Sequence, residues 1–321
     1  MVASVQSENE YEDLLAMWSD LESGLGIILS NPGNTQEFAH RVLQYDRWMQ
    51  GLMRRDPDVG LYLLFQLSSN SPVGYSASHA LVCAVLCHMI ASELRVTAKD
   101  RDSLVRAALS MNIAMTALQD TLSTQVEKPD KVQQDIIRAH SIKGAMMLAN
   151  LGVSDDNWLD IVSQHHDDGV DRVEPALVNP AIRLTRILKT VDRYSAMISP
   201  RMSRAGRSAT ESARAILATA SEKSDEIGHA LVRSVGLYPP GTYVRLDTDE
   251  VAVVVRRSER ANHPFVAIIG QSNGELLRTP RLHSTADNVP RIHSALAASA
   301  VRAQLNHFQI LQLSTYSAKQ A

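Results

Sequence analysis

Two adjacent histidines, His165 and His166, follow an apolar helical run in the segment WLDIVSQHHDDG, and His140 lies upstream in RAHSIKGAMML. Imidazole is the commonest side-chain ligand for transition metals. His79 and Asp192 also lie in or beside apolar helical runs, where a carboxylate needs a compensating cation. These residue types predict a metal pocket formed by His79, His140, His165, His166 and Asp192.

Each of these residues also has an interpretation without a metal. A lone histidine on a helix is more often a packed or surface side chain than a ligand. Asp192 could instead pair with an arginine of its own segment: Arg183, Arg186 or Arg193. Cys83 and Cys87 follow His79 at four-residue intervals on one helical face, and we interpret both thiols as packing residues, since free cysteine behaves as a small apolar side chain.

The elements that must position these residues are predicted to be helices. Residues 1–70 form helices broken by the turn signals NPGN and DPDVG. A helix that is apolar nearly all round begins near Ser76 and is expected to be central. The helical pattern then continues to about residue 220. We place the later helices at about 102–118, 131–150, 155–166, 179–198 and 208–235.

The pattern changes at the segment GLYPPG, residues 236–241. The runs TYVRL, EVAVVVRR and PFVAIIG are short and β-branched, which predicts three or four antiparallel strands. Residues 289–313 return to helical spacing. The predicted fold is mainly α, with an N-terminal helical region (1–70), an all-helical domain (71–235), and a small β module with a C-terminal helix (236–321).

Composition excludes several classes of protein. The 321 residues are 45% hydrophobic and 21% charged, which is ordinary for a globular protein. The net charge of −3 and the lack of a basic tract argue against nucleic acid as a partner. No apolar stretch approaches the roughly 20 residues that cross a bilayer, and the start lacks the pattern of a signal peptide. We therefore expect a cytoplasmic protein without membrane insertion.

The phrases around the candidate ligands resemble one known family, the HD-GYP branch of the HD-domain phosphohydrolases. AALSMNIAM resembles the family's AALLHDIGK, and HSIKGAMML resembles its H-x-x-x-G helix. WLDIVSQHHDDG resembles its histidine doublet with a DG turn, and RLTRILKTVDRYSAMISPR resembles the helix that carries its last aspartate. The intervals between these segments also agree with the family pattern, over about residues 70–235. The tail that begins YPPGTYVRL resembles the C-terminal extension of some members.

The resemblance implies a bacterial, all-helical HD-domain bundle that holds two or three metal ions, often iron or manganese. These ions activate a bridging hydroxide that hydrolyses cyclic di-GMP. By the same resemblance, His140, His165 and His166 hold one metal, and His79 and Asp192 belong to another. Arg201 and Arg204 resemble basic residues that face the phosphates; a solvated turn is the alternative interpretation of these two arginines.

This sequence departs from the family pattern where the family has its strongest ligands. Met111 and Asn112 replace the HD dyad, Met115 replaces the lysine that follows it, and VDRVEPA stands where GYP is expected. A thioether is a weak ligand for these ions, and a neutral amide is unsuited to bridging two cations. We therefore expect no catalytic residue at 111–112.

Three functions follow as hypotheses. The first is a catalytically inactive module that binds cyclic di-GMP or signalling proteins such as diguanylate cyclases, with one transition metal ion (iron, manganese, zinc or nickel) or none. The alternative is an active metal-dependent phosphohydrolase that uses a reduced metal site. The third is an interaction protein with neither metal nor nucleotide, in which the histidines are packed side chains.

Overall fold

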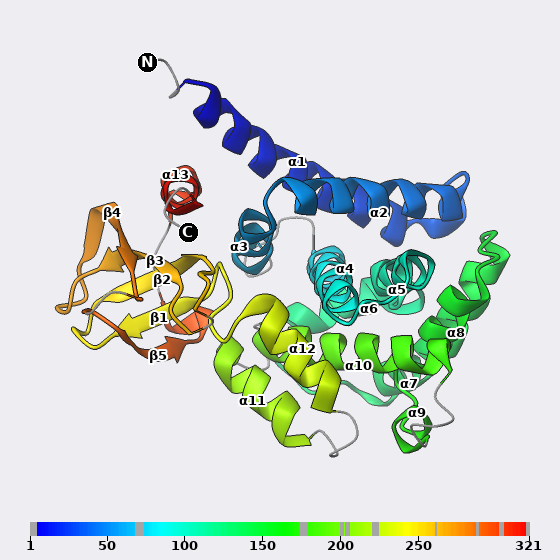
Figure 1. The fold of residues 1–321 in the computed structure, drawn as a ribbon. Helices are drawn as coiled ribbons and strands as arrows, with labels where there is room; N and C mark the ends of the chain where they lie inside the picture. Colours follow the sequence, from blue (N-terminus) through cyan, green and yellow to red (C-terminus); the bar gives the residue numbers. More distant parts are fainter. Residues whose placement is uncertain are drawn as a thin grey trace.

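Helices form most of the chain, and a small sheet follows them (Figure 1). The computed structural model describes residues 5–67, 74–173, 179–199, 202, 206–219, 225–260, 262–286, 289–301 and 305–318. The helices of the first half are α1 (Val5–Ser30), α2 (Phe38–Arg55), α3 (Pro57–Leu67), α4 (Tyr75–Glu93), α5 (Ala98–Ser110) and α6 (Thr116–Thr124), with short 3-10 turns η1 (Pro32–Asn34) and η2 (Ile113–Met115). They are followed by α7 (Lys131–Asn150), α8 (Asp156–Gln164), α9 (Gly169–Arg172), α10 (Pro180–Ile198), α11 (Ala209–Thr219), α12 (Asp225–Val235), η4 (Ala298–Ala300) and α13 (His307–Ala318).

Local capping explains why the helices that carry the candidate ligands begin where they do. Asp130 and Gln133 form a reciprocal capping box at the start of α7, whose bounds equal the predicted range. Asp155 accepts a hydrogen bond from the Trp158 amide at the start of α8. Asn179 caps α10 in the same way, with Pro180 in the first turn.

Helix α4 is the centre of the helical body, as its sequence predicts. It contacts α1, α3, α5, α6, α10 and α12, and nearly every side chain from Ser76 to Ile90 is buried. By length and composition alone α4 could cross a membrane, but 89% of the relevant window is buried inside the protein. Its apolar character on all sides therefore reflects its position in the core.

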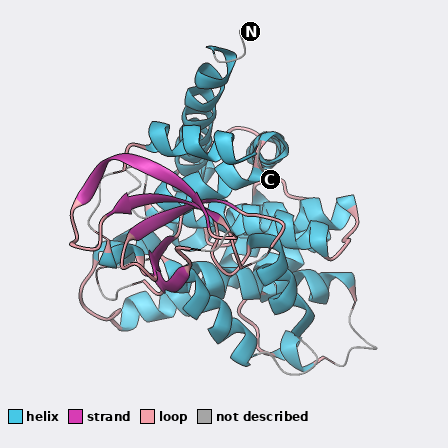
Figure 2. Ribbon diagram, turned by 60° about the vertical axis from the view of Figure 1, so that its left-hand side comes forward, coloured by secondary structure: helices cyan, strands magenta, loops and turns pink. Residues whose placement is uncertain are grey.

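The sheet has five antiparallel strands in the order β4-β3-β2-β1-β5, and Figure 2 shows it against one side of the helices. The strands are β1 (Tyr243–Leu246), β2 (Val251–Arg256), β3 (Phe265–Gly270), β4 (Leu276–Ser284) and β5 (Ile292–Leu296). Side chains alternate between its two faces. Val253, Val255 and Ala267 join the main helical core, whereas Val254 and Val266 belong to a small second core.

The prediction of a helix over residues 289–313 was wrong. Residues 292–296 form strand β5, and helix α13 begins only at His307. The backbone edge of β1 pairs with β5 from Tyr243 to Leu246, a tertiary contact that spacing within a short segment does not reveal. The sheet therefore has five strands, one or two more than predicted.

Buried charge and a glycine turn attach the sheet to the helices. Arg256 donates hydrogen bonds to Asp56 (2.5 Å) and Asp58 (3.3 Å) at the start of α3. Gly241, in the PPG turn, has φ +88°, and a Cβ there would lie only 2.7 Å from the Tyr62 carbonyl oxygen. Only glycine allows this close approach to α3, so the GLYPPG segment fixes where the sheet meets the helical body.

Candidate metal centre

Three histidines from two segments, helix α7 and the end of helix α8, lie close together. His140 lies in the middle of α7, His165 directly follows α8, and His166 is the next residue. One ring nitrogen of each lies within 4.8 Å of those of the other two. His140 and His165 are buried, whereas His166 is exposed. The cluster therefore has one side open to solvent.

Hydrogen bonds fix the tautomer of the two buried rings. Nδ1 of His140 lies 2.5 Å from the Ile137 carbonyl oxygen, and Nδ1 of His165 lies 2.7 Å from that of Val162. Because a carbonyl oxygen only accepts, both Nδ1 atoms must carry the proton. The two Nε2 atoms, 3.2 Å apart, then face each other with lone pairs if both rings are neutral.

Both buried rings are held in the neutral form. Burial, reinforced by the neighbouring His166, lowers the pKa of His165 to about 3. Burial also lowers the pKa of His140. Two buried lone pairs that face each other repel unless a cation lies between them. A histidine that donates Nδ1–H to a carbonyl and presents Nε2 is the usual arrangement of a metal ligand, so the donor set fits a transition metal ion.

A second group of donors lies beside the first. Nε2 of His79 is 2.8 Å from Oδ1 of Asp192 and 3.7 Å from Sγ of Cys83, and the three form a compact cluster. Asp192 also interacts electrostatically with His140 and His165. The five residues predicted from the sequence therefore fall into two groups, one of three histidines and one that contains His79 and Asp192.

His79 and Asp192 neutralise each other. Burial opposes a charged imidazole, but the Cys83 sulfur and the hydrogen bond to Asp192 outweigh it and raise the pKa of His79 to about 10. Burial would likewise raise the pKa of Asp192, but His79 holds it well below its usual range. At neutral pH the pair is therefore an imidazolium and a carboxylate. The charge of the Asp192 carboxylate is therefore balanced by the His79 imidazolium and needs no metal ion.

The arginines considered as partners of Asp192 include two that bind elsewhere. Arg186 donates to the carbonyl oxygens of Val170 and Val173, and Arg183 contacts Glu226 at 3.4 Å. His79 takes the place proposed for an arginine.

Comparison with known protein families shows to which family this chain belongs. The HD domain family profile matches residues 63–226, about half of the chain. This chain belongs to the HD-domain family, and within it to the HD-GYP branch.

Two similar proteins agree with that assignment. The chain is 26% identical over 193 residues to a protein named cyclic di-GMP phosphodiesterase PA4108 from Pseudomonas aeruginosa. That match covers 58% of this chain and 46% of the relative, so the chain spans about half of the relative's length. The fold is also similar to Bd1817, an HDG"Y"P protein from Bdellovibrio bacteriovorus, with a TM-score of 0.52, 12% identity and 72% of each chain covered.

The two residues that replace the HD dyad, Met111 and Asn112, lie next to helix α7, which carries His140. Met111 directly follows α5 and is buried, with 1% of its surface exposed, whereas Asn112 is half-buried. A Cβ on Gly144, one turn after His140, would lie 3.5 Å from the Met111 carbonyl oxygen. Met111 is part of the hydrophobic core, and its side chain therefore contributes packing.

Cys83 is buried in the hydrophobic core, as its interpretation as a packing residue predicts, and it also lies beside His79 and Asp192. Its four-residue spacing from His79 was visible, but Asp192, which completes the group, is more than 100 residues away in the chain and is brought close only by the packing of α10 on α4. Arg201 and Arg204, the predicted phosphate-binding residues, lie outside the described residues.

Two basic residues of α10 hold the segment that carries the histidine doublet. Lys189 contacts Asp168 at 2.8 Å and Asp171 at 2.6 Å, and Arg186 donates three hydrogen bonds to carbonyl oxygens of that segment. These contacts fix residues 167–173 directly after His165 and His166.

We expect Arg186→Ala to lower the free energy of unfolding by about 1–3 kcal/mol, because it leaves two partly buried carbonyl oxygens without their donor. It should also weaken metal binding by roughly tenfold, because the doublet loses its support. Arg183→Ala is the matched control, since its weak ion pair with Glu226 contributes about 0–1 kcal/mol. Urea denaturation and metal titration of both variants test this prediction; equal effects would contradict it.

Proposed function

We propose that this HD-GYP chain is a catalytically inactive cyclic di-GMP signalling module that holds one transition metal ion on His140, His165 and His166. The observation that carries the proposal is the pair of buried, neutral imidazoles whose Nε2 atoms face each other at 3.2 Å. Three imidazoles suit zinc, iron or nickel, with a further coordination position open to solvent or a ligand. When bound, such an ion would supply positive charge for a phosphate oxygen.

Loss of hydrolysis follows from what surrounds that donor set. The family places a bridging carboxylate at the position of Asn112, and an amide oxygen carries no charge with which to hold two cations. The second group is also poorly suited to a metal. A metal on Nε2 of His79 must displace the proton that His79 shares with Asp192, and the raised pKa of His79 makes that displacement unfavourable at neutral pH.

Cyclic di-GMP is the ligand proposed for the module because the similar protein PA4108 is named for its hydrolysis. Ligand binding does not need the bridging carboxylate, whereas the two-metal reaction does. We therefore expect the chain to bind cyclic di-GMP without hydrolysing it.

The alternative function is an active phosphohydrolase with a reduced site. The observation in its favour is the group formed by His79, Cys83 and Asp192, which offers three ligand atoms beside the histidine cluster. If the ion pair of His79 and Asp192 opened, these residues could hold a second ion. Because a metal would first have to displace the proton of His79, this function is the second candidate.

Calorimetric titration of cyclic di-GMP into metal-loaded protein, together with chromatography of the nucleotide after incubation, tests the proposal. We expect saturable binding and neither linear dinucleotide nor GMP. His165→Ala should weaken the binding. Product formation that disappears in His165→Ala would establish the alternative instead. Absence of binding would contradict the proposal and leave a protein-interaction role, for example with a diguanylate cyclase.

A further inference from the structure

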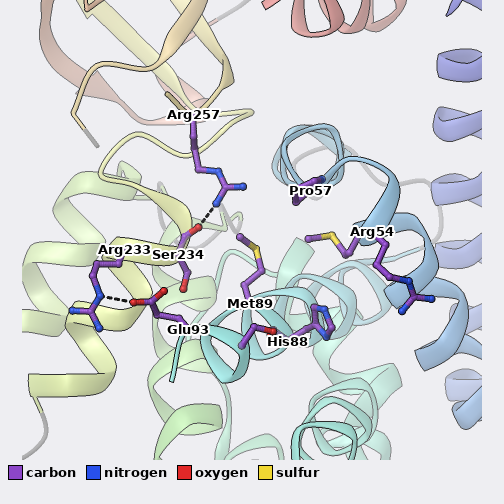
Figure 3. Close-up of a pocket in the computed structure, with 10 residues that line it drawn as sticks. Arg54, Pro57, His88, Met89, Glu93, Arg233, Ser234 and Arg257 are labelled. Atoms are coloured by element: carbon purple, nitrogen blue, oxygen red, sulfur yellow. Dashed lines mark hydrogen bonds and ion pairs between the residues drawn. The ribbon is translucent and has the colours of Figure 1, made fainter. Parts of the chain in front are cut away.

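A cavity separate from the metal centre lies where the sheet meets the helices. It has a volume of about 460 Å³. Figure 3 shows Arg257 entering it from the sheet, Arg233 and Ser234 from α12, His88, Met89 and Glu93 from α4, and Arg54 and Pro57 from the junction of α2 and α3. Met53 and Ser92 complete the lining. Four separate parts of the chain thus surround one cavity of ligand size.

The cavity lining has one arginine without a counterion among the described residues. Three of its lining residues are arginines, against a single acidic residue, Glu93. Glu93 pairs with Arg233 at 2.6 Å, and Arg257 is held by Asp58 at 2.5 Å and by the Ser234 carbonyl oxygen. Arg54 has no hydrogen-bond or ion-pair partner among the described residues. An anion in the cavity would supply that partner.

Two polar atoms of the lining are buried without a hydrogen bond in the described part of the chain. They are Oγ of Ser234 and Nδ1 of His88. Only 7% of the surface of Ser234 is exposed. Burial, with Arg101 nearby, lowers the pKa of His88 to about 4, so its ring is neutral and can donate or accept a hydrogen bond. Because an unpaired buried polar group is costly, these atoms indicate a ligand that pairs with them.

The remaining wall of the cavity is apolar and is formed by flexible methionine side chains. Met53 is buried, with 5% of its surface exposed, and Met89 is partly buried. Methionine side chains adapt their shape, and their sulfur atoms make favourable contacts with aromatic rings. A flat ring is therefore the apolar partner that this wall suits best.

From these features we propose that the cavity is a second binding site, for a small phosphorylated molecule with a flat aromatic ring, the chemistry of a nucleoside monophosphate. Arg54 binds the phosphate, since a guanidinium group pairs with phosphate oxygens in a fork geometry. Ser234 and His88 supply hydrogen bonds, and the two methionines contact the ring.

This site is distinct from the metal centre. His88 follows His79 by nine residues on α4, which separates them by about 13 Å along the helix axis. The proposal rests on no metal and no cyclic di-GMP, so it can fail or hold independently of the proposed function.

Calorimetric titration of the full chain with AMP, GMP and inorganic phosphate tests the site. Arg54→Ala removes an exposed guanidinium, and Ser234→Ala removes a hydroxyl that makes no hydrogen bond, so both variants should fold. Arg55→Ala is the matched control, because Arg55 is also exposed at the end of α2 but contacts Met17 instead of the cavity. His165→Ala controls for binding at the metal centre.

We expect at least one nucleotide to bind more tightly than inorganic phosphate. Arg54→Ala should weaken that binding by roughly tenfold or more, the effect of losing a hydrogen bond to a charged group. Ser234→Ala should weaken it several-fold, with Arg55→Ala and His165→Ala unchanged. Binding that is lost in His165→Ala but kept in Arg54→Ala and Ser234→Ala would overturn the proposal. So would inorganic phosphate binding as tightly as the nucleotides, or no binding of any probe.

Discussion

The double variant Met111→His, Asn112→Asp is expected to raise the metal content from about one to about two ions per chain, and to produce hydrolysis of cyclic di-GMP. The new residues would lie in the segment that contacts α7, since the Met111 carbonyl oxygen lies close to Gly144, one turn after His140. The aspartate would supply the negative charge that an amide lacks.

Elemental mass spectrometry and chromatography of the nucleotide measure these two outcomes. Met111 is a core residue, and a histidine there could lower stability. Asn112→Asp alone is therefore the second variant, since it changes a half-buried amide to a carboxylate of the same shape. If both variants fold and neither binds more metal than the wild type, the missing dyad does not explain the reduced site.

The second large effect is expected from His165→Ala, which should weaken binding of a transition metal by roughly 100-fold or more. His165 is fully buried and provides one of the two Nε2 atoms that face each other. In the wild type, zinc at about 100 times its dissociation constant should stabilise the fold by about 2.7 kcal/mol. The His165→Ala variant should show almost none of this zinc-dependent stabilisation.

Thermal melting with and without zinc measures that difference. His40→Ala is the control, because His40 is an exposed histidine on α2 whose ring forms a hydrogen bond with Gln44, far from the candidate ligands in the chain. It should behave as the wild type does. An equal zinc-dependent shift in His165→Ala would show that the metal binds elsewhere.

Much of the fold follows from local sequence signals. Helix α7 begins and ends at the predicted residues, because Asp130 and Gln133 form a capping box that is visible in the sequence. The central position of α4 follows from its apolar character on all sides. The five candidate ligands could be named because family resemblance fixes their order, and the structure places them in two clusters of possible metal ligands.

Features that depend on distant parts of the chain could not be predicted. Strand β5 forms because β1 offers it an edge, although its spacing is also compatible with a helix. The charge state of His79 depends on Asp192, which only the packing of α10 on α4 brings near. The cavity between the sheet and the helices draws its lining from α2, α3, α4, α12 and the residue after β2, so no single segment indicates it.

The most direct test of the account is the metal content per chain of untagged wild-type protein, purified with and without oxygen and measured by elemental mass spectrometry. We predict about one transition metal ion per chain, lost in His165→Ala. About two ions per chain would contradict the account and indicate an intact two-metal enzyme. Metal-free protein that takes up none on titration would contradict it as well.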